Sequence, residues 1–246
     1  MAARFPSPDP LPHRLLGLGH SHMRRLKEFM TREDGVVAGS SNFLIDHSQL
    51  SSTLIGFGGI RCEHLLAVGS HSRSNARARL GPHRHVPGVV ARAFESMQPD
   101  SLILWIGDND IAAIDDGRSP HDIGEELAYN IMAKASTLKR RYQLTQVYVV
   151  QLLPRYFTPR SRSTLQEIAR YNEIAFQVNQ VVYNEALEMN LDKHHLGFIF
   201  PQEDQDQHRY VDMRKYFLPD GVHLNSSGYR KCFKSMRHIA IKSAQE

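Results

Sequence analysis

The chain has 246 residues, of which 41% are hydrophobic and 23% are charged. This length suits one large domain or two small ones, and the apolar fraction is too high for a disordered chain. The longest apolar run, residues 101–106, is far shorter than the roughly 20 residues of a membrane-spanning helix, so we expect no membrane span. The net charge of +4 is compatible with an anionic partner but does not identify one.

The first 12 residues form a proline-rich leader in which no apolar stretch follows a basic cluster. This pattern is not that of a secretory signal, and we therefore expect an intracellular, cytoplasmic protein. Cys62 and Cys232 are isolated and far apart. Their spacing predicts two buried thiols rather than a disulfide scaffold or a zinc module.

After the leader, short apolar runs alternate with segments of helical periodicity, which implies βαβ units and a parallel sheet. We therefore expect one α/β domain over residues 13–246 with a three-layer, doubly wound, flavodoxin-like fold: a five-stranded parallel sheet with helices on both faces. In chain order the sequence predicts a strand at 13–19, a helix at 21–33, a strand at 51–57, helices at 61–68 and 87–97, a strand at 102–106, a helix at 123–142, a strand at 147–153, a helix at 163–189, a strand at 196–200 and a helix at 226–243.

Four clusters of glycines and polar residues fall where such a fold forms its sites. Residues 19–22, 56–59 and 107–110 follow the first three strands, and residues 220–223 precede the last helix. The carboxyl ends of parallel strands meet at one rim of a sheet, and the loops there form the binding crevice. We expect the four clusters to converge at that rim.

The residue types in these clusters are those of a serine hydrolase. Ser21 stands at a helix start, where a backbone N–H and the positive end of the helix dipole favour developing negative charge. His223 is the candidate base, and Asp220 is close enough in sequence to orient its imidazole. The Asn109 amide, the Gly59 N–H and the Ser21 N–H are the candidate donors of an oxyanion hole.

With these blocks the chain resembles the SGNH (GDSL-type) hydrolases, and it is similar to the SGNH esterase-like domains of proteins encoded by some animal retroelements. The resemblance covers about residues 14–240. It implies an SGNH-hydrolase type of fold and the same catalytic residues. The family's blocks appear, in family order, as Gly19-His20-Ser21, Gly59, Gly107-Asp108-Asn109-Asp110 and Asp220-Gly221-Val222-His223.

Two positions separate this chain from common serine hydrolases. His20 stands where the family usually has an aspartate. An aspartate would accept backbone N–H bonds there, and we expect a neutral histidine to be only a partial substitute. Met23 stands where a Gly-x-Ser-x-Gly elbow would need its second glycine, so the α/β-hydrolase motif is absent.

Structural roles remain open for the same residues. Ser21 could cap the first helix, and Asn109 could be an ordinary cap or turn residue. Gly59 could supply a turn with positive φ, and Gly58 is an alternative for its role. Asp110 is expected to stabilise its loop rather than to take part in catalysis.

Two further features suggest other partners. The pairs His20/His22 and His83/His85 raise the question of zinc, but neither has a third ligand by spacing, and we expect no metal. Residues 64–94 contain no acidic residue and could contact nucleic acid or another anionic surface, although a solvated loop is the simpler interpretation. Its arginines include Arg73, Arg77, Arg79 and Arg84.

We therefore expect a serine esterase that acts on small, acetyl-like acyl esters and needs no cofactor. The alternative is a catalytically silent descendant of the fold that binds nucleic acid or another anionic partner. A metal-dependent hydrolase is a third interpretation, and the sequence does not separate an esterase from an acyltransferase. The sequence does not identify the acyl chain or the alcohol part of the substrate.

Overall fold

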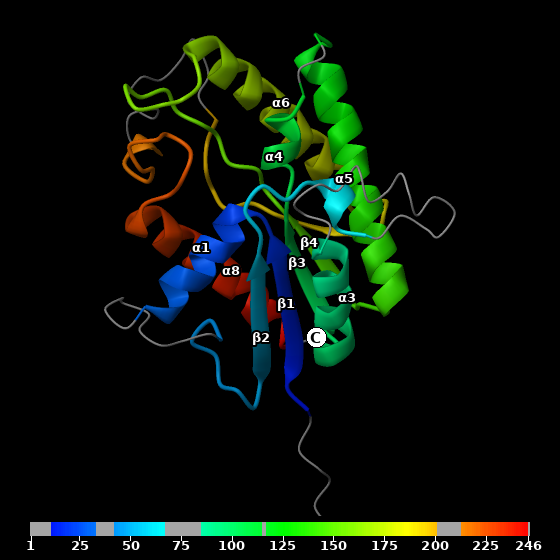
Figure 1. The fold of residues 1–246 in the computed structure, drawn as a ribbon. Helices are drawn as coiled ribbons and strands as arrows, with labels where there is room; N and C mark the ends of the chain where they lie inside the picture. The colour runs from blue at the N-terminus through cyan, green and yellow to red at the C-terminus, as the bar shows by residue number, and fades with distance from the viewer. Residues whose placement is uncertain (1–10, 33–41, 67–84, 115–116, 201–212, 246) are drawn as a thin grey trace, which may run out of the picture.

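Five parallel strands form the centre of the computed structural model, which describes residues 11–32, 42–66, 85–114, 117–200 and 213–245. The strands lie side by side in the order β2-β1-β3-β4-β5 (Figure 1). This order is that of flavodoxin-like folds and confirms the predicted architecture. The strands are β1 (His13–Gly19), β2 (Leu50–Gly56), β3 (Ser101–Trp105), β4 (Gln146–Val150) and β5 (Asp192–His194).

Helices cover both faces of the sheet (Figure 1). Because successive strand residues point to opposite faces, each central strand contributes to two core layers. Leu102 and Leu104 of β3 pack with α3, α5 and α6, whereas Ile103 and Trp105 pack with α1 and α8. The longer helices are α1 (Ser21–Thr31), α3 (Val86–Met97), α5 (Pro120–Tyr142), α6 (Leu165–Glu185) and α8 (Ser226–Ser243).

Capping residues set where the helices begin. The Asn225 side chain accepts the N–H groups of Ser227 and Gly228 at the start of α8. At the start of α1 the cap is His20, whose Nδ1 accepts the His22 N–H, and Ser21 is the first helical residue. The interpretation of Ser21 as the cap of this helix is therefore wrong, and the Ser21 hydroxyl does not accept a backbone N–H of the first helical turn.

The last predicted strand is misplaced. Residues 196–200 show alternating burial, but β5 lies earlier, where Asp192–His194 pairs with β4. The backbone groups of residues 196 and 198 bind the Gln151 side chain instead of a neighbouring strand. Gln151 accepts the Leu196 N–H and donates to the Phe198 carbonyl. Gly197, with φ +71°, also interrupts the extended backbone.

The predicted helix at 61–68 is also reduced, because its described part holds only the 3-10 turn η1 (Cys62–His64). The other predicted elements end within a few residues of the observed ones. Both cysteines are free and buried, as expected. Within the described ranges, no helix combines the length and the apolar character needed to cross a membrane.

Candidate active site

The candidate site lies where the strand order reverses beside β1, the place at which open α/β sheets bind their ligands. The loops after three strands are joined there by backbone hydrogen bonds. The His20 N–H donates to the Trp105 carbonyl at 3.1 Å, and the Phe57 N–H donates to the Gly19 carbonyl at 3.0 Å. These bonds extend the sheet register past the strand ends, so the predicted convergence of the first three clusters is observed.

Asp220 and His223 form the hydrogen-bonded pair expected from their spacing. Asp220 Oδ2 lies 2.8 Å from His223 Nδ1, and Asp220 Oδ1 accepts the N–H groups of Val222 and His223, each at 2.9 Å. Burial acts to raise the pKa of Asp220, but these hydrogen bonds outweigh it and hold the pKa below its usual value. Since a carboxylate only accepts, Nδ1 carries the proton of the neutral ring, and no described residue donates to the lone pair of Nε2.

His22 connects this pair to the first loop. Its ring centroid lies 5.7 Å from that of His223, and the ring stacks on Trp105 at 5.2 Å. His22 Nδ1 is 3.1 Å from the Tyr229 hydroxyl. Burial, together with the electrostatic effect of the neighbouring His20, lowers the pKa of His22 well below its usual value, so this imidazole is neutral at physiological pH. The Asp220–His223 pair therefore lies beside the residue that follows Ser21.

Ser21 itself is half-buried at the first position of α1. Within the described part of the chain, neither its N–H nor its hydroxyl has a hydrogen-bond partner, and the structure shows no bond between Ser21 and His223. The first N–H groups of a helix have no partner inside the helix. The Ser21 N–H is therefore a free donor at the positive end of the helix dipole.

Asn109 and Gly59 come from different loops, and Asn109 contacts the residue that follows Gly59. Asn109 Nδ2 donates to the Ile60 carbonyl at 2.9 Å, and no described residue accepts the second N–H of the amide. Gly59 has φ +73°, and its N–H has no partner among the described residues, whereas Gly58 has an ordinary φ. The backbone requirement for glycine thus falls on Gly59.

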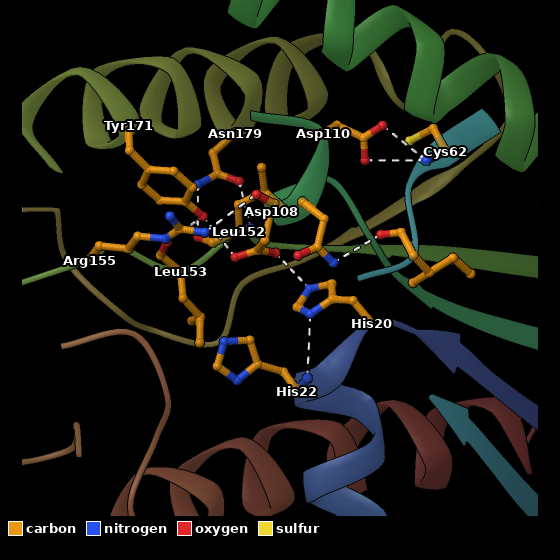
Figure 2. A network of polar contacts seen from close by, with 12 residues as sticks. His20, His22, Cys62, Asp108, Asp110, Leu152, Leu153, Arg155, Tyr171 and Asn179 are labelled. Carbon is orange, nitrogen blue, oxygen red and sulfur yellow. Dashed lines mark hydrogen bonds and ion pairs between the residues drawn. The ribbon is translucent and has the colours of Figure 1, made fainter. Parts of the chain in front are cut away.

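A buried polar network lies beneath these loops (Figure 2). Asp108 Oδ2 lies 2.6 Å from His20 Nε2, although the ring N–H is not well aligned with that oxygen. Asp108 Oδ1 accepts the Tyr171 hydroxyl of α6 at 2.7 Å, and the Arg155 guanidinium lies over the Tyr171 ring at 3.8 Å. Burial acts to raise the pKa of Asp108, but the close approach of His20 and the Tyr171 hydrogen bond hold it well below its usual range.

Asp110 has the structural role expected of it. Its carboxylate accepts the Cys62 N–H at 3.0 and 3.2 Å and so ties the short helix α4 (Asp108–Ile111) to η1. Burial raises the pKa of Asp110 to about 6, because the hydrogen bonds from Cys62 only partly offset the loss of hydration.

Sequence reasoning missed the roles of His22, Tyr171 and Tyr229. Tyr171 stands on the buried stripe of α6, and a buried tyrosine hydroxyl needs a hydrogen-bond partner. From this requirement the sequence could have predicted a buried hydrogen bond of Tyr171, but not that Asp108 is the partner. Tyr229 is likewise buried on α8, where its hydroxyl reaches His22.

The structure offers no support for a metal site in the residues it describes, since no three His, Cys, Asp or Glu side chains gather with suitable geometry. His20 and His22 contact Asp108 and Tyr229 instead. His83 lies outside the described residues, as do the four arginines proposed to contact an anionic partner, Arg73, Arg77, Arg79 and Arg84.

Solved structures and a family model place this chain among known proteins. A GDSL-like lipase from Bacteroides thetaiotaomicron has a TM-score of 0.56 at 12% identity, with 96% of this chain and 93% of that chain covered. The aryl esterase of M. smegmatis has a TM-score of 0.54 at 16% identity, with 94% and 99% covered. These likenesses show the fold, and no curated protein sequence matches the chain. Since the model of the GDSL-like lipase/acylhydrolase family matches residues 21–236, the chain belongs to this family of hydrolases.

Proposed function

We propose that the protein is a serine esterase that hydrolyses small, acetyl-like acyl esters. Ser21 is the nucleophile, His223 the base and Asp220 the residue that orients it. The Ser21 N–H, the Gly59 N–H and the Asn109 amide form the oxyanion hole. No cofactor takes part in this scheme.

One observation carries the proposal: the Ser21 N–H, the Gly59 N–H and the second N–H of the Asn109 amide have no partner among the described residues, and they belong to loops that are tied to one another. Asp108, next to Asn109, contacts His20, next to Ser21. Asn109 also holds Ile60, next to Gly59. Preorganised donors of this kind are worth most when they are aimed at the oxygen on which charge develops. Nearby, His223 Nε2 has no partner among the described residues, and the His223 side chain is 25% exposed.

In the proposed reaction, the Ser21 hydroxyl attacks the acyl carbon while His223 Nε2 takes its proton. The carbonyl oxygen becomes an oxyanion that accepts hydrogen bonds from the three donors. The intermediate collapses to an acyl-serine, and His223 returns the proton to the leaving alcohol. A water molecule then repeats these steps, which releases the carboxylic acid and restores Ser21.

The test compares hydrolysis of a chromogenic acetyl ester by the wild type, Ser21→Ala and Ser226→Ala. Ser226 is a matched control because it is also the first residue of a helix and is exposed. We expect Ser21→Ala to lower kcat by at least about a thousandfold and Ser226→Ala to leave it unchanged. Equal rates in the wild type and Ser21→Ala would remove Ser21 from the mechanism.

A fluorophosphonate probe separates this proposal from the silent binding module. The esterase predicts one covalent label on Ser21, whereas the binding module predicts none. Full activity in a chelator is expected and would exclude the metal-dependent alternative. Assays with added alcohols distinguish an esterase, whose product is the free acid, from an acyltransferase. The similarity to retroelement-encoded domains stays a prediction.

A further inference from the structure

His20 differs from the family's usual aspartate, and its surroundings show how the chain accommodates the change. The imidazole is fully buried. Nδ1 accepts the His22 N–H at 3.3 Å, which is the bond that an aspartate at a helix start would make. Nε2, on the other side of the ring, lies 2.6 Å from Asp108 Oδ2. The histidine therefore keeps the capping role and adds a contact that an aspartate could not make.

Asp108 is fixed from the opposite side. Its Oδ1 accepts the Tyr171 hydroxyl at 2.7 Å, and its backbone carbonyl lies 3.5 Å from Arg155 Nη2. The Arg155 guanidinium covers the Tyr171 ring, so the carboxylate is enclosed by α6 and by the chain after β4. A carboxylate held in this way cannot move away from position 20 without breaking a buried hydrogen bond.

The residue types at positions 20 and 108 therefore depend on each other. An aspartate in place of His20 would set two carboxylates near each other in a space closed to water, where one of them would have to take up a proton. Replacing Asp108 with asparagine would remove the charge beside His20 Nε2 and leave one oxygen to face both the buried Nε2 and the Tyr171 hydroxyl. Each residue is favourable only in the presence of the other.

The two residues also flank the proposed chemistry, because His20 precedes Ser21 and Asp108 precedes Asn109. Any shift of the contact displaces the nucleophile and one oxyanion donor relative to each other. We infer that His20 and Asp108 act as one interdependent pair, which positions Ser21 and Asn109 for reaction. The inference rests on the proposed function for its catalytic part, and both members are positioning residues that do not touch the substrate.

The test is a cycle of His20→Asp, Asp108→Asn and the double variant, with kcat and KM measured on a chromogenic acetyl ester. We expect His20→Asp, which restores the family's residue, to lower kcat by about a hundredfold, and Asp108→Asn to lower it by about tenfold. The double variant is expected within about tenfold of the wild type, because its aspartate caps α1 without a facing charge. KM should stay nearly constant, because the variants lose stabilisation of the transition state and not of the bound substrate. A double variant whose kcat equals the product of the single effects would overturn the inference.

A second comparison covers the case in which His20→Asp does not fold. His20→Gln keeps a donor in the place of Nε2, whereas His20→Asn keeps an acceptor in the place of Nδ1 and loses the reach to Asp108. We expect His20→Gln to retain at least about fivefold more activity than His20→Asn. The opposite order would refute the pairing.

Thermal unfolding of the same variants separates this inference from the proposed function. Coupling between positions 20 and 108 in the unfolding midpoint, with no coupling in kcat, would show a structural pair and overturn the positioning role. Activity that persists in Ser21→Ala would instead refute the proposed function, while the unfolding cycle would still decide whether the two residues depend on each other.

Discussion

Replacing Tyr171 with phenylalanine tests whether Asp108 is held as a buried anion. The substitution removes one hydroxyl, which donates to Asp108 Oδ1 at 2.7 Å and is buried between α6 and α4. The ring and its contact with the Arg155 guanidinium remain. The change is therefore confined to the hydroxyl, whose second contact, with the Leu153 carbonyl at 3.4 Å, is much weaker.

The magnitude follows from the charge of the acceptor. A hydrogen bond to a charged group contributes about 1.5–3 kcal/mol, against about 1 kcal/mol for a neutral pair. The phenylalanine no longer has a hydroxyl to desolvate, which offsets part of the loss, and we expect the free energy of unfolding to fall by about 2 kcal/mol. For a chain of this size that corresponds to a decrease in Tm of about 4–8 °C.

The pH dependence gives a second prediction for the same variant. The pKa of Asp108 is lower in the folded than in the unfolded chain. Its stabilising contribution is therefore complete above the unfolded pKa of about 3.9, and it is lost as the pH falls toward the folded pKa. Tyr171→Phe removes one of the interactions that depress this pKa, so its cost should be full at pH 7 and shrink below about pH 4.

Urea unfolding at several pH values measures both effects, with Tyr183→Phe as the control. Tyr183 lies on the same helix and is 48% exposed, and its hydroxyl makes no hydrogen bond among the described residues. We expect the control to change stability by less than about 0.5 kcal/mol. In the Asp108→Asn background, Tyr171→Phe should cost only about 1 kcal/mol. An equal cost in both backgrounds would show that the hydroxyl does not stabilise a charge.

Three further substitutions test the neighbouring loops. Asn109→Ala should lower kcat by about a hundredfold to a thousandfold with little change in KM, measured on the acetyl ester, because it removes a proposed oxyanion donor. Gly107→Ala should destabilise the fold by about 1–3 kcal/mol in thermal unfolding, since φ is +126° and an added Cβ would lie 3.0 Å from both Ile131 and Leu152. Asp110→Asn should raise stability at pH 8 by about 1 kcal/mol and have less effect at pH 4, measured by urea unfolding. The pKa of about 6 lies above the unfolded value, so wild-type stability is lost as the pH rises through it.

The architecture could be predicted because the central strands are almost wholly apolar. β3 is buried throughout, and its residues alternate between two helical layers. Such a run needs cover on both faces, which the intervening helical segments provide. The edge strand β5 has no such signal, because Asp192, Lys193 and His194 are polar and only half-buried. Its place is set by pairing with β4 and by the Gln151 side chain, contacts that periodicity does not encode.

The site was predictable in so far as it follows local rules. Asp220 and His223 are close in sequence and meet in a turn. Gly59 is distinguished by the need for a positive φ. The partner of His20 could not be inferred in this way, because Asp108 comes from another loop and the sequence offers several carboxylates near strand ends. The expectation that the histidine would be only a partial substitute left out this second contact.

Other residues of α6 besides Tyr171 help to hold the surroundings of Asp108 in place. Two asparagine side chains of the same helix bind the chain that follows β4: Asn179 accepts the Leu152 N–H and donates to its carbonyl, and Asn172 does the same for Arg155. These four bonds fix the segment that carries the Arg155 guanidinium onto the Tyr171 ring. A buried carboxylate is stable only where its surroundings are already in place. The position of Asp108, and with it that of the Asn109 loop, therefore depends on the packing of α6, and loosening the Asn172 or Asn179 contacts should lower the rate of the proposed reaction without touching the substrate.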